Sequence, residues 1–278
     1  MAIDRSIAFI GGGNMATALI QGLLASGTSR PDQLIASDVR PETLTALRDQ
    51  HGIRTTADNA AACAEDVVVL CVKPQLLPAV LAELAPHLGR DTLVISIAAG
   101  VPLAVIESQL PERRAVRVMP NTPALVGAGA AAVVAGRYAS ADDLRLSRAL
   151  FESVGVVVEV PEALLDAVTA LSGSGPGYVF YLAEALVDAG RAVGLSEDVA
   201  STLALQTVYG AAKLLHESRE APAELRRRVT SPGGTTHAGI TALEALDVRG
   251  AFRACVTAAR DRGAELGRDA LAKLASKP

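Results

Sequence analysis

Three consecutive glycines near the start of the sequence stand between a short apolar run and a helical pattern. The apolar run at residues 7–10 predicts a buried strand, and residues 16–24 have the spacing of a helix. Gly11 would permit a tight turn, Gly13 would let the backbone approach a pyrophosphate, and Ala16 would pack helix against strand. The first N–H groups of the helix and the positive end of its dipole would face the phosphates. This spacing predicts a dinucleotide site, with an ordinary glycine turn as the alternative.

Hydroxyl side chains and glycines gather again at residues 230–236, immediately before another helical pattern. Backbone N–H groups at the start of a helix suit a small anion such as a carboxylate. Ser231, Thr235 and Thr236 add hydroxyl groups to these amides, so we predict an anion site here. Residues 171–177 form a similar cluster with fewer hydroxyl groups. For both clusters, a glycine-rich connection between helices is the alternative.

Asp38 ends a second predicted strand about 20 residues beyond the glycine turn, where an acid can bind a ribose 2′-hydroxyl group. This position favours NAD. Ser37 and Arg40 stand beside it and could instead hold a 2′-phosphate group, which favours NADP. A third interpretation is that Asp38 only caps the turn into Pro41. The sequence leaves the three interpretations open.

Three further loops follow predicted strands and are stiff or built of small residues, at residues 72–75, 96–100 and 119–123. Ligands of open α/β folds bind in the crevice at such strand ends. Lys73 could contact the cofactor there or lie in solvent. Asn121 offers donors and an acceptor between two prolines. Together the loops indicate one shared site.

Apolar segments alternate with helical ones through the first part of the chain. Besides the first strand and helix, the predicted strands are residues 34–37, 66–72, 92–97, 115–118, 130–135 and 154–160, and the predicted helices are 41–50, 76–88 and 142–153. We expect a short crossover at residues 55–65. Alternation of this kind predicts right-handed βαβ units and a parallel sheet, as in an α/β Rossmann-type domain.

Beyond Pro161 only helical periods occur, so we predict a sheet domain at residues 1–161 and an all-helical domain at residues 162–278. The helices are expected at residues 162–171, 178–193, 197–217, 223–229, 235–246 and 248–273. Several are apolar on more than one face and need another surface to bury. We therefore predict that this half dimerises with a second copy, with a self-contained bundle as the alternative.

The composition narrows the class of protein. Half of the 278 residues are hydrophobic and the net charge is −4, which gives no electrostatic case for nucleic acid or an anionic membrane. Three cysteines without C-x-x-C spacing predict neither a disulfide framework nor a metal site. No apolar run is long enough for a membrane span, and no signal peptide is evident, so we expect a cytoplasmic protein.

The sequence shows a nicotinamide site and an anion site without an evident strong general base. No Ser-His-Asp arrangement and no H-E-x-x-H motif can be placed. This suits reduction of a cyclic imine, whose nitrogen is readily protonated, whereas oxidation of an alcohol would need a Lys or His base.

Six motifs occur along the chain in this order: residues 11–16 (GGGNMA), 72–74 (VKP), 96–100 (SIAAG), 119–123 (MPNTP), 172–176 (SGSGP) and 231–236 (SPGGTT). Together they resemble the pyrroline-5-carboxylate reductases, over residues 7–264. The resemblance implies the last step of proline biosynthesis, in which hydride passes from NADPH, or NADH, to the C=N carbon of 1-pyrroline-5-carboxylate and gives L-proline. It also implies a Rossmann domain, a helical domain that intertwines in a homodimer, and decamers built as pentamers of dimers.

The resemblance also assigns roles to individual residues. The backbone around Gly233, Gly234 and Thr235, with Ser231, would bind the substrate carboxylate. Thr236 would hydrogen-bond the ring nitrogen and help deliver the proton. Cofactor contacts would come from the positions that match the family's motifs, which are Asn14, Met15, Val72, Lys73, Pro74, Ala98 and Asn121. Residues 37–40 match a variable adenosine-ribose loop in which many members lack an acid, so Asp38 departs from that pattern.

Two rival functions are considered. A β-hydroxyacid dehydrogenase would share the architecture, but it would use a lysine on the helix after the first glycine cluster, and residues 178–182 contain none. A nicotinamide-binding sensor would keep the glycine turn and need not keep residues 231–236. Cofactor binding without consumption of NAD(P)H on addition of a cyclic imine would favour the sensor.

Overall fold

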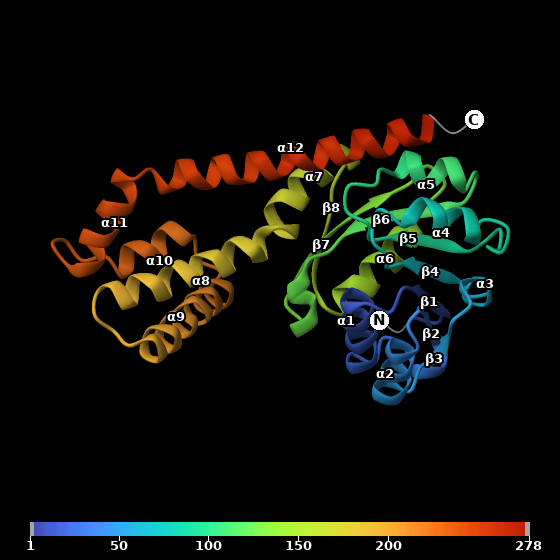
Figure 1. Cartoon of the computed structure of the whole chain (residues 1–278), viewed down its shortest axis with the longest axis horizontal. Helices are drawn as coiled ribbons and strands as arrows, with labels where there is room; N and C mark the ends of the chain where they lie inside the picture. The colour runs from blue at the N-terminus through green and yellow to red at the C-terminus, as the bar shows by residue number, and fades with distance from the viewer. Residues whose placement is uncertain (1–2, 276–278) are drawn as a thin grey trace. The chain divides into compact units, whose positions relative to one another are not determined.

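The computed structural model describes residues 3–275, which form two compact units (Figure 1). The first unit comprises the described residues of Met1–Ser174 and Ala258–Pro278, and the second is Gly175–Thr257. The sequence boundary at Pro161 was placed where strands give way to helices, so it marks a different division. The domains 1–161 and 162–278 stay a prediction, and their ends at residues 1–2 and 276–278 lie outside the described residues.

The first unit is built around an eight-stranded sheet with the strand order β3-β2-β1-β4-β5-β6-β7-β8. Its strands are β1 (Ile7–Ile10), β2 (Leu34–Ser37), β3 (Arg54–Thr56), β4 (Val67–Leu70), β5 (Leu93–Ser96), β6 (Arg114–Met119), β7 (Gly129–Ala135) and β8 (Gly155–Glu159). Every neighbouring pair is parallel except β6 and β7. The strand order reverses between β1 and β4, which is where ligands bind in open α/β sheets.

Helices cover both faces of this sheet, because successive side chains of a strand point to opposite faces. In β1, Ile7 and Phe9 join one hydrophobic core, whereas Ala8 and Ile10 join the other. The first core is closed by α1 (Asn14–Ala25), α2 (Pro41–His51) and α6 (Ala141–Glu152), and the second by α3 (Asn59–Ala62), α4 (Leu77–Leu84) and α5 (Leu103–Gln109). Burial on both faces explains the continuous apolar run of β4.

Two features of the sheet differ from the sequence prediction. The expected crossover at residues 55–65 contains part of β3 and all of α3. β3 is short and polar, so no apolar run in the sequence indicates a strand there. β7 runs antiparallel to β6, because their connection holds only the 3₁₀ turn η2 (Thr122–Val126) and is too short for a crossover helix.

Short helical segments complete the first unit. They are η1 (Pro31–Gln33), η3 (Glu162–Leu164), α7 (Leu165–Val168) and the π-helix η4 (Thr169–Gly173). The last part of the long helix α12 (Val248–Ala275) also belongs here. Across residues 3–275, none of the helices is long and apolar enough to cross a membrane.

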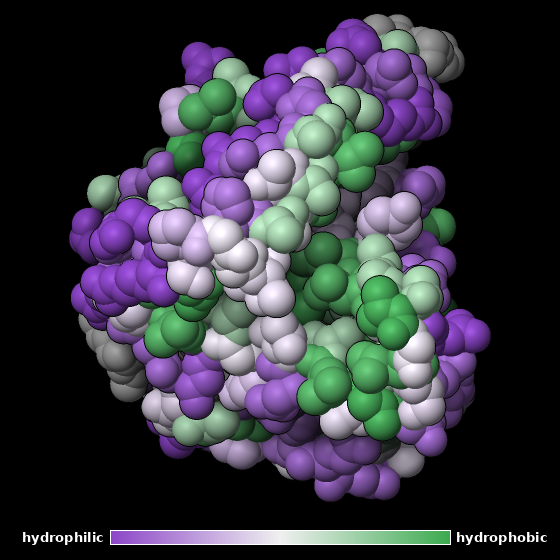
Figure 2. Space-filling model, turned by 90° about the vertical axis from the view of Figure 1, so that its left-hand side faces the viewer, coloured by the Kyte–Doolittle hydropathy of each residue, from purple (hydrophilic) through white to green (hydrophobic). Residues whose placement is uncertain are grey.

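The second unit is helical, with no strand among residues 175–257. It contains α8 (Gly175–Ala192), α9 (Glu197–Ser218), α10 (Pro222–Arg228), α11 (Thr235–Ala245) and the first part of α12. Within those residues only Ala200 and Ala204 are buried, whereas Phe180, Tyr181 and Leu203 are more than half exposed. Hydrophobic side chains gather on the surface of this unit (Figure 2). A unit with so little buried surface needs a partner to cover its apolar faces.

One apolar groove of the helical unit lies between α8 and α12. It has a volume of about 480 Å³ and is lined by Tyr178, Tyr181, Leu182, Ala185, Val248, Ala251, Phe252 and Cys255. Its lining is almost entirely hydrophobic. Such a groove fits the apolar face of another helix better than it fits a charged metabolite.

Candidate cofactor and substrate sites

The glycine turn joins the carboxyl end of β1 to the start of α1. Gly11 has φ +96°, and an added Cβ atom would lie 2.9 Å from the carbonyl oxygen of Cys71, so only glycine fits. At Gly13 an added Cβ atom would meet nothing within 4 Å, and no side chain caps the first turn of α1. The first amides of this helix, at Asn14 and Met15, therefore have no intrahelical acceptor and border open space. This cradle fits the pyrophosphate of a dinucleotide.

Gly12 has a role that the sequence prediction missed. An added Cβ atom would lie 2.7 Å from Thr43 and 2.8 Å from Leu47, so this glycine lets the turn pack against α2. Its N–H group donates to Oδ2 of Asp38 at 2.9 Å. A third glycine, beyond the two that the dinucleotide motif needs at this turn, is the sequence feature that could have indicated it.

The carboxylate of Asp38 has partners inside the protein. It accepts hydrogen bonds from the N–H groups of Gly12 and Arg40 and from the Arg40 guanidinium, whose Nε lies 3.1 Å from Oδ1. Burial opposes ionisation, but the hydrogen bonds from the Arg40 side chain and from the two amides outweigh it and hold the pKa of Asp38 below its usual value. The Asp38 side chain is 9% exposed and that of Arg40 is 56% exposed. Arg40 therefore presents the accessible charge at the end of β2.

Ser37 is fully buried and faces away from that charge. Its hydroxyl group donates to Oδ1 of Asn59 at 2.7 Å, and Asn59 in turn donates to Glu83. These bonds tie β2 to α3 and α4. Asn59 could not be found from the sequence because it begins a helix of only four residues. Contact between Ser37 and the cofactor stays a prediction.

Two more predicted segments reach the same edge of the sheet, after β4 and β5. A methyl carbon of Val72 would lie 3.3 Å from a Cβ atom added at Gly11, so this segment borders the glycine turn. Lys73 is exposed and its ammonium group has no partner within the described residues, whereas Pro74 is half-buried and Ala98 is buried. Because β2 and β5 lie on opposite sides of β1, a dinucleotide with its adenosine at β2 would extend its nicotinamide toward β5.

Asn121 lies after β6 and uses both ends of its carboxamide to hold neighbouring segments. Its Nδ2 donates to the carbonyl oxygen of Ser172 at 3.0 Å, and its Oδ1 accepts from the N–H group of Ala130 at 2.8 Å. The first glycine cluster therefore packs close to β6. At Gly173 an added Cβ atom would lie only 2.5 Å from Cε of Met119. These contacts give Asn121 a structural role; its contact with the cofactor stays a prediction.

The second glycine cluster belongs to the helical unit and leads into α11. Gly233 has φ +72°, and the N–H group of Gly234 donates to the carbonyl oxygen of Ser231 at 3.0 Å. Thr235 and Thr236 are the first two residues of α11, both are exposed, and no side chain caps that helix. The turn therefore presents unpaired amides and hydroxyl groups together, which suits a carboxylate.

The predicted site residues thus form two groups. One group surrounds the carboxyl edge of the sheet in the first unit, and the other gathers at the start of α11 in the second unit. In each group, a glycine turn leads into a helix whose first backbone N–H groups are not capped by a side chain. The roles assigned to individual side chains in the two groups stay predictions.

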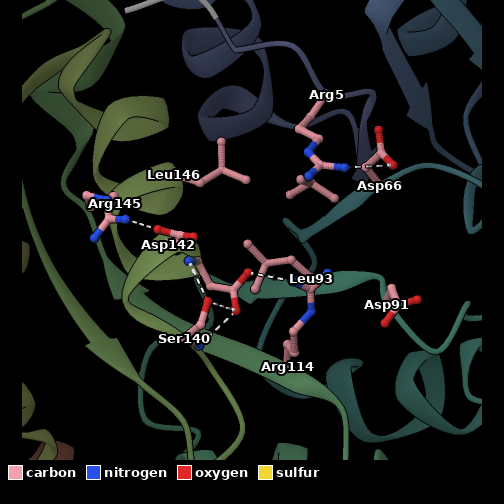
Figure 3. Close-up of a pocket in the computed structure, with 11 residues that line it drawn as sticks. Arg5, Asp66, Asp91, Leu93, Arg114, Ser140, Asp142, Arg145 and Leu146 are labelled. Carbon is pink, nitrogen blue, oxygen red and sulfur yellow. Dashed lines mark hydrogen bonds and ion pairs between the residues drawn. The ribbon is translucent and has the colours of Figure 1, made fainter.

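A pocket of about 400 Å³ lies at the opposite, amino-terminal edge of the sheet (Figure 3). Six of its seven charged side chains form ion pairs with one another, which are Arg5 with Asp66, Arg114 with Asp143, and Arg145 with Asp142. This pocket is not part of the dinucleotide site, because the glycine turn lies at the other edge of the sheet.

Metal binding and the reactivity of Cys63 and Cys71 can be judged from the described residues. Residues 3–275 hold no group of three His, Cys, Asp or Glu side chains that could bind a metal. Burial raises the pKa of Cys71, and burial together with the nearby charges of Glu83 and Asp58 raises the pKa of Cys63 to about 11. Both therefore stay protonated near neutral pH and are poor nucleophiles.

Two family profiles match the chain. Residues 6–100 match the profile described as NADP oxidoreductase, coenzyme F420-dependent, and residues 162–266 match the profile described as pyrroline-5-carboxylate reductase dimerisation. With the glycine cradle and the strand order, these matches define the class of protein: an NAD(P)-dependent oxidoreductase with a helical dimerisation region.

Individual relatives narrow this class to one family. The pyrroline-5-carboxylate reductase of Methanosarcina acetivorans is 45% identical over 95% of this chain and 99% of the relative. The solved pyrroline-5-carboxylate reductase from Coxiella burnetii superposes with a TM-score of 0.89 at 40% identity, covering 95% of this chain and 99% of that one. The Plasmodium falciparum enzyme, solved with NADP bound, gives a TM-score of 0.83 at 29% identity, covering 96% and 100%. The chain belongs to the pyrroline-5-carboxylate reductase family.

Proposed function

We propose that this protein reduces 1-pyrroline-5-carboxylate to L-proline with a hydride from NADPH, the last step of proline biosynthesis. The observation that carries the proposal is the 45% identity with a pyrroline-5-carboxylate reductase over nearly the whole chain. The open cradle at Gly13 and the uncapped start of α11 support it, because the reaction needs one site for a dinucleotide and one for a carboxylate.

The reaction adds a hydride to the carbon of the C=N bond and a proton to its nitrogen. Bound NADPH supplies the hydride. The amides at the start of α11, with Ser231 and residues 233–235, bind the substrate carboxylate. The Thr236 hydroxyl group donates a hydrogen bond to the ring nitrogen and helps deliver the proton. The imine nitrogen is itself basic and readily takes up a proton, which is why no strong general acid is needed in this site.

We propose NADPH as the preferred cofactor and NADH as a slower alternative. Asp38 is the residue that would favour NADH, but its carboxylate already accepts from Gly12 and Arg40. The half-exposed guanidinium of Arg40 supports NADPH, because arginine has donors that match a 2′-phosphate group. The same arrangement supports the third interpretation of Asp38, since its carboxylate also caps the turn into α2.

For the assembly we propose a homodimer formed through the helical unit, with five dimers building a decamer. The family profile at residues 162–266 and the scarcity of buried side chains in the second unit support the dimer. The decamer rests on the family resemblance alone. The cytoplasmic location also stays a prediction.

The two rival functions are disfavoured by separate features. A β-hydroxyacid dehydrogenase would need a lysine base on the helix after the first glycine cluster, and α8 has none. A sensor without turnover would have no need for the uncapped, hydroxyl-lined start of α11.

The test follows oxidation of NADPH and of NADH in separate reactions with purified protein and 1-pyrroline-5-carboxylate. We expect turnover with both and a higher kcat/KM with NADPH. A parallel reaction supplies a 3-hydroxyacid with NADP. Turnover of the hydroxyacid alone would establish the dehydrogenase, and binding of NADPH without turnover of any cyclic imine would establish the sensor.

A further inference from the structure

The last part of α12 packs on the sheet unit through one narrow face. Residues 258–275 belong to that unit, although the helix begins in the other. Gly263, Leu266, Gly267 and Ala270 follow the spacing i, i+3, i+4, i+7, so they share one side of the helix. Gly263 is buried and Ala270 packs partly against a hydrophobic core of the sheet unit, whereas Leu266 lies at the rim of this face and is 43% exposed.

This face lies against the segment that follows β5, close enough for van der Waals contact. A Cβ atom added at Gly267 would lie 3.7 Å from Cγ of Pro102 and 4.0 Å from the carbonyl oxygen of Gly100. A Cβ atom added at Gly100 would in turn lie 3.2 Å from Cβ of Leu266. A Cβ atom added at Gly263 would lie 3.2 Å from Oδ1 of Asp166. The helix backbone therefore lies directly against residues 100–102, where a larger side chain would separate them.

The contacted segment is one of the loops at the carboxyl edge of the sheet. Ala98 and Val101 are each 4% exposed, so the segment is well packed. Gly100 has φ +69°, so the backbone of the segment has a well-defined conformation there. It lies on the side of β1 away from Asp38 and Arg40. An NADPH molecule with its 2′-phosphate at Arg40 would bring its nicotinamide, and not its adenosine, toward this segment.

We infer that α12 is a positioning element for the nicotinamide half of the cofactor, with Leu266 and Gly267 as its positioning residues. They touch no cofactor themselves. They hold the backbone of residues 98–102 in the conformation that positions the nicotinamide ring. Binding of the adenosine half depends instead on α1, β2 and Arg40. This inference rests on the proposed function, because it takes the bound molecule to be NADPH.

The experiment compares two ligands on three variants of the full-length protein. NADPH reports on the whole site, whereas adenosine 2′,5′-bisphosphate reports on the adenosine half alone. Gly267→Leu inserts a bulky side chain against Pro102 without lowering helix propensity. Gly267→Ala is the conservative control, since its Cβ atom fits at ordinary contact distance. Glu265→Leu adds the same bulky side chain on the exposed side of α12, where Glu265 pairs only with Arg262.

We expect Gly267→Leu to raise the dissociation constant of NADPH about tenfold, equivalent to about 1.4 kcal/mol, and to leave that of the bisphosphate within about twofold. Gly267→Ala and Glu265→Leu should bind both ligands like the wild type. Hydrogen exchange of the ligand-free protein gives a second readout: Gly267→Leu should speed exchange at residues 98–102 and leave residues 11–16 unchanged.

Unchanged NADPH binding by Gly267→Leu, or equal loss of both ligands, would overturn the inference. If Gly267→Leu fails to fold, Leu266→Ala replaces it, because this change keeps Cβ but removes Cδ1, the other Leu266 atom that lies against Gly100, without adding bulk; the same outcomes apply. Failure of the wild type to bind NADPH is a different result. It would reject the proposed function, and faster exchange at residues 98–102 would then show only that α12 orders this loop.

Discussion

The carboxylate of Asp38 lies at a position where the sequence favours a contact with a ribose hydroxyl group. In the structure this carboxylate accepts hydrogen bonds from other groups of the protein. Its bonds to the N–H group of Gly12 and to Arg40 join the loop after β1 to the turn from β2 into α2. An acid with its oxygens so occupied contributes little free acceptor capacity to a ligand. Under the proposed function, we expect the neighbouring guanidinium of Arg40 to determine the choice between NADPH and NADH.

Replacing Arg40 by alanine should therefore change cofactor preference. We expect Arg40→Ala to weaken NADPH binding about 10-fold to 100-fold, the usual loss for a hydrogen bond to a charged group, and to leave NADH binding equal or slightly stronger because Asp38 is released. Titration of both cofactors by nicotinamide fluorescence measures this. Arg48→Ala is the control, since Arg48 is an exposed residue of α2, the helix that follows Arg40, and pairs with Asp49. Equal weakening of both cofactors would show that Arg40 does not contact the 2′-phosphate.

Thr236 allows a second test at this scale. We expect Thr236→Ala to lower kcat about 100-fold, as loss of a group that helps deliver a proton typically does, with little change in the dissociation constant of NADPH. Thr241→Ala serves as the control, because the Thr241 hydroxyl group only donates to the carbonyl oxygen of His237 within α11. Full turnover by Thr236→Ala would remove this hydroxyl group from the mechanism.

At the scale of elements, the glycine turn combines a glycine needed for folding with one kept open for a ligand. Gly11 has a positive φ and a carbonyl oxygen against its Cβ position. Gly13 has an ordinary φ of −75° and empty space in the same test. Nothing in the fold requires glycine at position 13, which is why a ligand is the better explanation for it.

The two glycines should therefore respond differently to substitution. Gly13→Val should keep the thermal stability of the wild type and lose NADPH binding, because its side chain occupies the cradle. Gly11→Ala should destabilise the fold by about 2 kcal/mol or more, since it forces a non-glycine residue into a left-handed conformation beside Cys71. Thermal unfolding and cofactor titration of both variants measure the contrast. NADPH binding by Gly13→Val would mean that the opening motif is misinterpreted.

Much of this element pattern could be predicted from the sequence, for a physical reason. Strands buried on both faces are continuous apolar runs, so β1 and β4 were evident, and so were the loops at their carboxyl ends. β3 was missed because it is a polar edge strand, and the reversed β7 because strand direction depends on the length of a connection. Partners such as Asn59 for Ser37 depend on side-chain geometry that no spacing in the sequence encodes.

At the scale of the whole molecule, the two units differ in how they bury their apolar side chains. The sheet unit encloses two hydrophobic cores, whereas the helical unit buries almost nothing of its own. Its exposed Leu, Phe and Tyr side chains form a surface too apolar to remain in water. The stability of the helical unit is therefore expected to depend on protein concentration.

A charge placed in the groove between α8 and α12 should weaken the dimer. Phe252 lies in that groove and is 48% exposed. We expect Phe252→Glu to raise the dimer dissociation constant about 30-fold or more, as loss of a central aromatic contact does. Sedimentation velocity over a dilution series measures it, with Gln50→Glu on the sheet unit as the control for added charge. A dimer of Phe252→Glu that resists dilution like the wild type would place the interface elsewhere.

The path of α12 also has a consequence for how the protein is made. Residues 258–275 help to complete the sheet unit, yet they are translated after the entire helical unit. Domains usually fold one at a time as the nascent chain leaves the ribosome, the earlier before the later. Here the sheet unit cannot be completed until the helical unit has been translated. The loop after β5 stays uncovered until then. During translation we therefore expect this loop to be more accessible to solvent than in the completed protein.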